Sequence, residues 1–194
     1  MPNHCTHRLV INGPQEDVTR LVDLLHDGDS PFSFNSLIPM PEELRGTSSP
    51  NGLTGKEMTK KYGHDSLRNA WALSNWGTKW NAYEVNMWGV QSPLELLAHA
   101  GGDGTREVEY DFQTAWSPPL PFMEKLFAEN PTLTFTWYGI EEQLAWGCFI
   151  LVEGGEIVEG GHCDSSEQVI WSLSDWHDRF RWGEEDEDED EGAE

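Results

Sequence analysis

Glu107-Val-Glu-Tyr-Asp-Phe-Gln-Thr114 is the stretch of sequence that decides the fold. Its apolar side chains, Val108, Tyr110 and Phe112, alternate with polar ones, which is the period-two pattern of a strand with one buried face. After it, Pro118-Pro119 opens a segment with apolar residues at helical spacing up to Glu129. Residues 133–138 alternate again, so this part of the chain predicts strand, helix and strand.

The N-terminal part predicts the same order. Residues 8–12 form a short apolar strand that ends at Gly13-Pro14, and residues 15–26 follow with one apolar helical face. Residues 32–38 are expected to form a second strand, closed by Pro39-Met40-Pro41. The order strand, helix, strand, strand, helix, strand predicts an α+β fold of the ferredoxin-like split βαβ type, with an antiparallel sheet and two helices on one face.

Three additions to this fold are expected. A long insertion covers about 42–104, with helical turns near 42–44, 56–62, 65–73 and 92–99 and a strand over 82–88. A hairpin at 144–161 extends the sheet, and a terminal helix from Gln168 to Trp182 covers an edge or the open face. Residues 1–182 then make one domain, 183–194 make a disordered acidic tail, and it stays open whether 42–104 is a separate lobe.

Charge is the second strong signal. The chain has 35 acidic and 12 basic residues, a net charge of −23. Nine of the acidic residues lie in 184–194, so the rest of the chain is acidic as well. This balance opposes binding to nucleic-acid phosphates and to acidic membrane surfaces, and it permits basic protein partners.

The hydropathy pattern, the first residues and the cysteine count favour a protein of the cytoplasm. No run of apolar residues is long enough for a transmembrane helix, and the first residues lack the apolar core of a signal peptide. The three cysteines, Cys5, Cys148 and Cys163, are an odd number, which is typical of free thiols in a reducing compartment.

Two tryptophan-bearing segments are the candidate binding site, Asn75-Trp-Gly-Thr-Lys-Trp80 and Thr114-Ala-Trp-Ser-Pro-Pro119. Both follow ends of the sheet, so they are expected to meet and form a concavity lined by tryptophan. Lys79 either contacts an indole ring or a ligand anion, or extends outward while Trp76 and Trp80 pack on the sheet. For the second segment the plainer reading is that Ser117 caps a helix with Pro118 in its first position. The candidate residues are Asn75, Trp76, Lys79, Trp80, Thr114 and Trp116.

Several of these motifs together resemble one family. They are the start Met1-Pro-Asn-x-Cys5, the segment Phe34-Asn-Ser-Leu-Ile-Pro-Met-Pro41, the two tryptophan segments with Phe112, and the region from Tyr138 to Gly147. The chain resembles the YubB-like proteins of phages and plasmids over most of residues 1–160, although His4 stands where the family has an aromatic residue. The resemblance implies a ferredoxin-like domain and a mobile-element origin, and it implies no catalytic residues.

No motif predicts a cofactor, a metal or a catalytic group. His4, Cys5 and His7 with His162 and Cys163 carry metal-ligand atoms, but their spacing is not that of a zinc site. Neighbours in sequence diverge on a strand, so the His–Cys pairs are not evidence of an activated nucleophile. We therefore expect a protein that is not an enzyme.

Three functions follow from these features. The first is a phage- or plasmid-type accessory protein that acts by protein contacts, in its most concrete form an acidic DNA mimic that inhibits a host nucleic-acid-handling or defence protein. The tail would then contribute Glu184, Glu185, Asp186, Glu187, Asp188, Glu189, Asp190 and Glu191. The alternative is a small-ligand or nucleotide-binding domain that uses the tryptophan-lined pocket. A third is single-strand binding, with Phe135 and Trp137, or Tyr110 and Phe112, as stacking platforms.

Overall fold

A single antiparallel sheet of six strands organises the part of the chain that the structure describes. The computed structural model describes residues 3–45, 67–88 and 104–163 of the chain. The strands lie side by side in the order β2-β3-β1-β4-β5-β6, and every neighbouring pair is antiparallel. Their bounds are β1 His4–Pro14, β2 Tyr83–Trp88, β3 Thr105–Ala115, β4 Thr134–Glu141, β5 Gly147–Glu153 and β6 Glu156–Cys163.

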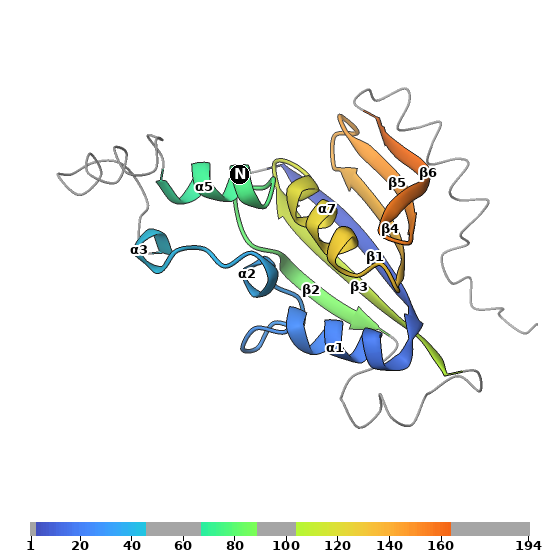
Figure 1. Ribbon diagram of the computed structural model, residues 1–194. Coiled ribbons are helices and arrows are strands. Elements are labelled where there is room, and N and C mark those ends of the chain that lie inside the picture. Colours follow the sequence, from blue (N-terminus) through green and yellow to red (C-terminus); the bar gives the residue numbers. More distant parts are fainter. Residues whose placement is uncertain (1–2, 46–66, 89–103, 164–194) are drawn as a thin grey trace, which may run out of the picture.

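Two helices cover one face of this sheet (Figure 1). Helix α1 (Gln15–Leu25) follows β1 directly, and α7 (Leu120–Glu129) joins β3 to β4. Three short helices lie beside them: α2 (Phe34–Leu37), α3 (Glu42–Arg45) and α5 (Leu67–Asn75). The protein is therefore α+β with an antiparallel sheet, as the alternation of residues 107–138 predicts.

Most of the expected elements are confirmed. The strands expected at 8–12, 107–114 and 133–138 are β1, β3 and β4, and the helices expected at 15–26 and 118–129 are α1 and α7. The expected hairpin is β5 and β6, and it extends the sheet beyond β4. Helical structure at 42–44 and within 65–73 is confirmed by α3 and α5.

The strand expected at 32–38 is wrong. Residues Phe34–Leu37 form α2, and the second strand of the order is instead β2, which pairs with β3 at the edge of the sheet. The helical turn is held by tertiary contacts that the local pattern does not contain. The amide of Phe34 donates to Asn81 Oδ1 at 2.7 Å, and the hydroxyl of Ser36 donates to the carbonyl of Leu25 at 3.3 Å.

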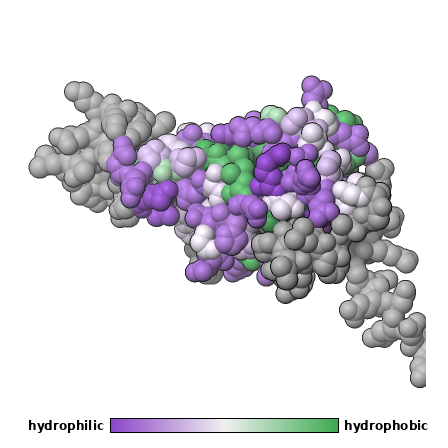
Figure 2. Space-filling model, turned by 60° about the horizontal axis from the view of Figure 1, so that its bottom comes forward, coloured by the Kyte–Doolittle hydropathy of each residue, from purple (hydrophilic) through white to green (hydrophobic). Residues whose placement is uncertain are grey.

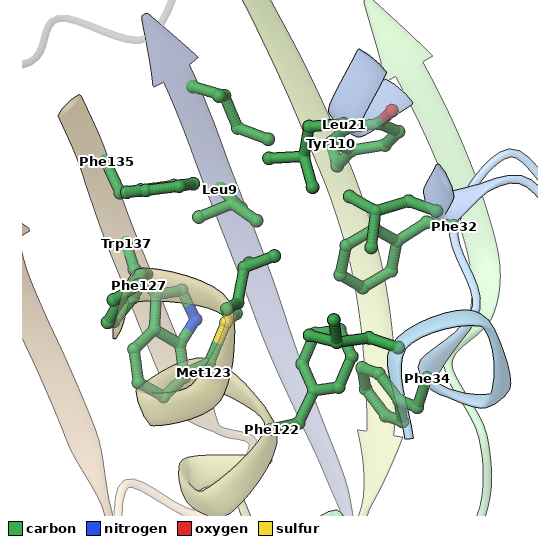
Figure 3. Packing of buried hydrophobic residues seen from close by; sticks show 14 of the residues in the cluster. Leu9, Leu21, Phe32, Phe34, Tyr110, Phe122, Met123, Phe127, Phe135 and Trp137 are labelled. Carbon is green, nitrogen blue, oxygen red and sulfur yellow. The ribbon is translucent and has the colours of Figure 1, made fainter. Parts of the chain in front are cut away.

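The core fills the space between the sheet and the helices (Figure 3). Leu9 and Tyr110 point from the sheet, and Phe122 and Met123 point from α7 toward them, all nearly or fully buried. Leu44, Ala72 and Trp76 belong to the same buried cluster. The described part of the range 42–104 thus contributes to this core. Residues 46–66, 89–103 and 164–194, with the helices expected at 56–62, 92–99 and 168–182 and the acidic tail, lie outside the described residues.

Candidate functional site

The two tryptophan segments meet at the end of β3, as expected. The hydroxyl of Thr78 donates to the carbonyl of Ala115 at 2.9 Å and accepts from the Ala115 amide at 3.2 Å. The hydroxyl of Ser117 donates to the carbonyl of Gly77 at 2.6 Å. We call this contact between residues 76–80 and 114–118 the loop junction.

The three tryptophans of the junction face different surroundings. Trp76 is only 3% exposed, and its indole N–H donates to the carbonyl of Ile38 at 2.9 Å. Trp80 is 36% exposed and Trp116 is 52% exposed. Trp76 is therefore a core residue, whose one polar atom is satisfied inside the protein. It does not line a surface site, and Trp80 and Trp116 supply the exposed rings.

The other candidate residues of the junction have structural partners. The amide of Asn75 donates to the carbonyl of Trp71 at 2.8 Å, one helical turn earlier. Thr114 is fully buried, and its hydroxyl donates to the carbonyl of Ser117 at 2.9 Å. The ammonium of Lys79 lies 5.7 Å from the centroid of the Trp80 ring, a cation–π distance. Lys79 is thus placed against an indole, which is one of the two arrangements expected for it.

The expected cap at Ser117 is wrong. Helix α7 begins at Leu120, its N-cap residue is Pro119, and no side chain caps it. Ser117 lies too far ahead of the first turn, and its hydroxyl is bound to the carbonyl of Gly77. This serine closes the loop junction instead of opening the helix.

A partly exposed aromatic edge adjoins the junction, consisting of His4, Lys79, Trp80 and Tyr83. The Trp80 and Tyr83 rings meet edge to face at 6.1 Å. The Tyr83 hydroxyl donates to the carbonyl of Thr114 at 3.1 Å, so its oxygen accepts from His4 Nδ1 at 2.6 Å, which assigns the proton of His4 to Nδ1. Burial, aided by the charge of Glu84, raises the pKa of Tyr83 to about 12, so it stays a neutral donor.

Beneath the junction lies a buried polar row, formed by Cys5, His7, Thr114 and Glu141. His7 is 1% exposed, and its Nε2 lies 2.9 Å from the Thr114 hydroxyl. Because the single hydroxyl proton of Thr114 is used on Ser117, Nε2 of His7 is the donor and Nδ1 carries a lone pair. Burial lowers the pKa of His7 to about 3, so the ring is neutral.

The thiol of Cys5 is not set up as a nucleophile. Cys5 is fully buried, and this burial, with the nearby carboxylate of Glu141, raises its pKa to about 12. A nucleophilic cysteine needs a lowered pKa and access to substrate. Glu141 is itself 4% exposed, and its Oε2 accepts the amides of Gln143 at 2.9 Å and Ala145 at 3.2 Å. Through Glu141, the buried row therefore stabilises the turn after β4.

The histidines and cysteines considered for a metal site lie on two separate strands. His4, Cys5 and His7 lie on β1, whereas His162 and Cys163 lie on β6, with β4 and β5 between them. Within the described ranges, no three His, Cys, Asp or Glu side chains are close enough together to hold a metal ion.

The aromatic platforms considered for single-strand binding are also wrong. Tyr110, Phe112, Phe135 and Trp137 are all fully buried. Tyr110, Phe135 and Trp137 point to the face that α1 and α7 cover (Figures 1 and 3). Phe112 shares this face with Tyr110, because alternate residues of a strand lie on one face. A nucleobase has no access to these rings, so single-strand binding would need other residues.

Three residues of these networks, His7, Tyr83 and Glu141, are not among the binding-site candidates drawn from the sequence. His7 continues the alternation of Leu9 and Ile11 toward the N-terminus, and extending the strand expected at 8–12 would have placed it inside. Tyr83 heads the alternation Tyr83, Val85, Met87 in the same way. Glu141 has no such signal, since its burial depends on the turn that follows β4.

The described surface is strongly acidic. Figure 2 shows a face on which most of the coloured side chains are hydrophilic and the apolar area is small. Among the described residues, the exposed basic side chains are Arg20, Arg45 and Arg68. The exposed acidic ones are Glu16, Asp23, Asp27, Asp29, Glu42, Glu43, Glu84, Glu107, Glu124, Glu129, Glu142, Glu153, Glu156 and Glu159. Negative charge thus lies on the folded body, independently of the tail at 184–194.

Comparison with known proteins gives little further information. No protein-family model matches the chain, and no curated protein matches it. One solved structure is similar, the crystal structure of a protein api92 from Yersinia pseudotuberculosis, with the family-model DUF1281. It has 12% identity and a TM-score of 0.48, covering 84% of this chain and 98% of that one. A likeness of this degree carries no functional information. None of the described helices is long and apolar enough to cross a membrane.

Proposed function

We propose that this protein is an accessory protein of a phage or plasmid, similar to the YubB-like family, and that it acts in the cytoplasm by protein contacts. In its most concrete form it is an acidic DNA mimic that occupies the basic cleft of a host nucleic-acid-handling or defence protein. The observation that carries the proposal is the acidic charge on the folded body. Exposed carboxylates lie on α1, β3, α7 and the β5–β6 hairpin, with few exposed bases between them.

Charges held at fixed positions on the folded body are better suited to mimic DNA than charges on an unfolded segment. A basic cleft that binds DNA gains affinity from releasing the counterions of ordered phosphates. Carboxylates on helices and strands can present charge at fixed spacings, whereas charges on an unfolded segment must be ordered on binding. The charges on the body are therefore the better mimic, and those of the tail, Glu184 to Glu191, add long-range attraction.

We also propose that the sheet is of the ferredoxin-like type. The support is the order β2-β3-β1-β4, all antiparallel, with α1 and α7 on one face and the β5–β6 hairpin as an addition. An experimental structure in which β1 is not flanked by β3 and β4 would contradict this assignment.

The test of the proposed function uses a competition between the protein and duplex DNA. The full-length chain is immobilised, host lysate is treated with nuclease, and retained proteins are compared at low and high salt. Mimicry requires a basic DNA-handling protein that binds at low salt, elutes at high salt and is displaced by added duplex. If duplex DNA does not displace the retained proteins, the hypothesis of DNA mimicry is contradicted.

Two variants, one on the body and one in the tail, locate the charges responsible. The first replaces Asp23, Asp27 and Asp29 with Asn on the body, and the second ends the chain at Trp182. Weakened capture by the first and little change in the second would assign the contact to the body. The reverse result would assign it to the tail.

A second candidate is suggested by the aromatic edge, where Lys79 lies against the exposed Trp80 ring. A cation beside an indole suits a small anion with a flat ring, such as a nucleotide. Titration with nucleotides should then change tryptophan fluorescence, and Lys79→Met should abolish the change, while Arg20→Met, which removes an exposed cation on α1, leaves it intact. An unchanged signal in the parent protein would remove this candidate.

A further inference from the structure

The face of the sheet opposite α1 and α7 is divided into an acidic half and an apolar half. The acidic half follows β3, where Arg8 of β1 binds both Asp111 oxygens at 2.8 and 2.9 Å and Glu109 at 2.9 Å. The apolar half follows β4 and β5. It consists of Tyr138 and Ile140 of β4, Phe149 and Leu151 of β5, and Val10 of the adjacent strand β1.

This apolar strip is continuous. Tyr138 and Phe149 are directly opposite each other, with their ring centroids 5.5 Å apart. Leu151 and Val10 lie one row along, on either side of Thr136. Phe149, Leu151 and Ile140 are half-buried, although the described helices that pack on the sheet, α1 and α7, lie on its other face. A strip of this kind beside a charged half is typical of a surface that one amphipathic element covers.

The chain itself carries such an element. Beyond β6, the sequence from Gln168 to Trp182 has apolar residues Val169, Leu173, Trp176 and Phe180, which fall on one side of a helix. Arg179 and Arg181 lie at the two borders of this stripe, about 90 to 110° from its centre at 100° per residue. The opposite side carries the polar residues Ser174, Asp175 and Asp178, with Trp171 and Trp182 near its two ends.

The end of β6 is well placed for this docking. Cys163 pairs with Gly147, and Gly147 pairs with Ile140, so the chain leaves the sheet at the Ile140 end of the apolar strip. Residues 164–167 can span at most about 14 Å. Since adjacent strands are about 4.8 Å apart, β4 is within reach of this connection.

We propose that residues 168–182 of the same chain dock as a helix along β4 and β5, with Val169, Leu173, Trp176 and Phe180 on the apolar strip. The lengths are comparable, because Val169 to Phe180 span about 16 Å in a helix and the strip, from Ile140 to the row of Thr136, spans about 13 Å. The helix runs from the Ile140 end toward the Thr134 end.

The charges agree as well. At the Thr134 end, Asn12 lies between Thr134 and Glu107, and Glu107 is exposed on the acidic half. With the apolar stripe on the sheet, one of the two arginines at its borders faces β3. The positive charge of this arginine then lies beside the negative half of the face.

The test measures how fast trypsin cleaves full-length protein after Arg179 and Arg181. Leu173→Asp places a charge in the stripe, and Ser174→Asp places the same charge on the outer side one residue away. Ile140→Asp and Leu151→Asp place it in the strip on the sheet. Docking predicts that cleavage accelerates about tenfold or more in Leu173→Asp and in both sheet variants, and little in Ser174→Asp.

Cleavage after Arg106, which is buried in β3, reports unfolding of the whole body and serves as the internal control. A sheet variant in which Arg106 is also cleaved faster is replaced by the other one. Acceleration in Leu173→Asp without acceleration in an intact sheet variant would overturn the proposal, because the helix would then dock elsewhere. Equal rates in all variants would overturn it too. Protection that increases over a hundredfold range of protein concentration would assign the stripe to a second copy and overturn the intramolecular docking.

Discussion

The hydroxyl of Ser117 donates a hydrogen bond of 2.6 Å to the carbonyl of Gly77, and this contact joins two loops that are 40 residues apart in the chain. The approach is close enough that a side chain at Gly77 has no room. A Cβ there would lie 2.5 Å from Pro121 Cδ and 2.8 Å from the Pro118 carbonyl oxygen. Gly77 also has a φ of +86°, a conformation that glycine adopts at little cost.

Replacing Gly77 with Ala should therefore destabilise the protein more than backbone strain alone. Gly28→Ala is the matched control, because Gly28 has a φ of +61° and a Cβ added there would have nothing within 4 Å. We expect a loss of about 1 kcal/mol in the free energy of unfolding for Gly28→Ala, and about 3 kcal/mol or more for Gly77→Ala. Urea unfolding of both variants measures this difference. Equal losses would mean that the loops separate easily.

Trp76→Phe should show that this indole is a core residue. The substitution leaves a cavity and removes the donor to the carbonyl of Ile38, so we expect a loss of about 2–3 kcal/mol in the free energy of unfolding. Trp116→Phe, at a half-exposed ring, should change it by less than about 0.5 kcal/mol. Thermal unfolding of the two variants is the measurement, and similar losses would contradict the assignment of Trp76 to the core.

Stability should decrease in mild acid because of His7. Its pKa is about 3 in the folded protein, while an unfolded chain has a histidine pKa near 6.5. The unfolded state therefore binds more protons between these values, so the free energy of unfolding is full above about pH 6.5 and falls as the pH approaches 3. His7→Leu should flatten this fall relative to the parent protein, whereas the exposed His26→Leu should leave it unchanged. The measurement is urea unfolding at several pH values. If the free energy of unfolding decreases as steeply with falling pH in His7→Leu as in the parent protein, the prediction is contradicted.

The thiols of Cys5 and Cys148 should be unreactive in the folded protein. Both are fully buried thiols, and the raised pKa of Cys5 keeps it protonated at pH 8. In a Cys163→Ser variant, an aromatic disulfide reagent should detect no fast thiol in buffer and both thiols in denaturant. A fast reaction of Cys5 in buffer would mean that the buried polar row opens to solvent.

The strands and helices around the core follow from periodicity in the sequence. In β3, Val108, Tyr110 and Phe112 alternate cleanly, and in α1 the residues Val18, Leu21, Val22 and Leu25 share one helical face and are buried. In these elements the local pattern and the tertiary packing require the same side chains to be inside. The expectations for them are therefore confirmed.

Residues 32–38 show where this reasoning fails. Phe32, Phe34 and Leu37 are all buried, a spacing that suits a turn running into a helix as well as a strand. The choice is made by Asn81, which binds the Phe34 amide and the Ser33 hydroxyl from 47 and 48 residues away. Similarly, the inward position of Trp76 depends on the carbonyl of Ile38. Contacts at this separation leave no periodic trace in the sequence.

The central position of β1 constrains how the chain is assembled during synthesis. β1 is made first, yet its two neighbours are β3 and β4, whose pairing partners extend from Thr105 to Glu141. At about 5–20 residues per second, the ribosome needs roughly 6–25 s to make the residues between Pro14 and Glu141. Until β3 is complete at Ala115, the apolar residues Leu9 and Ile11 have no neighbouring strand to join, and until β4 follows, one side of β1 stays unpaired. The protein thus combines a compact native sheet with a nascent chain whose first strand waits for its partners and is exposed to chaperones and to aggregation.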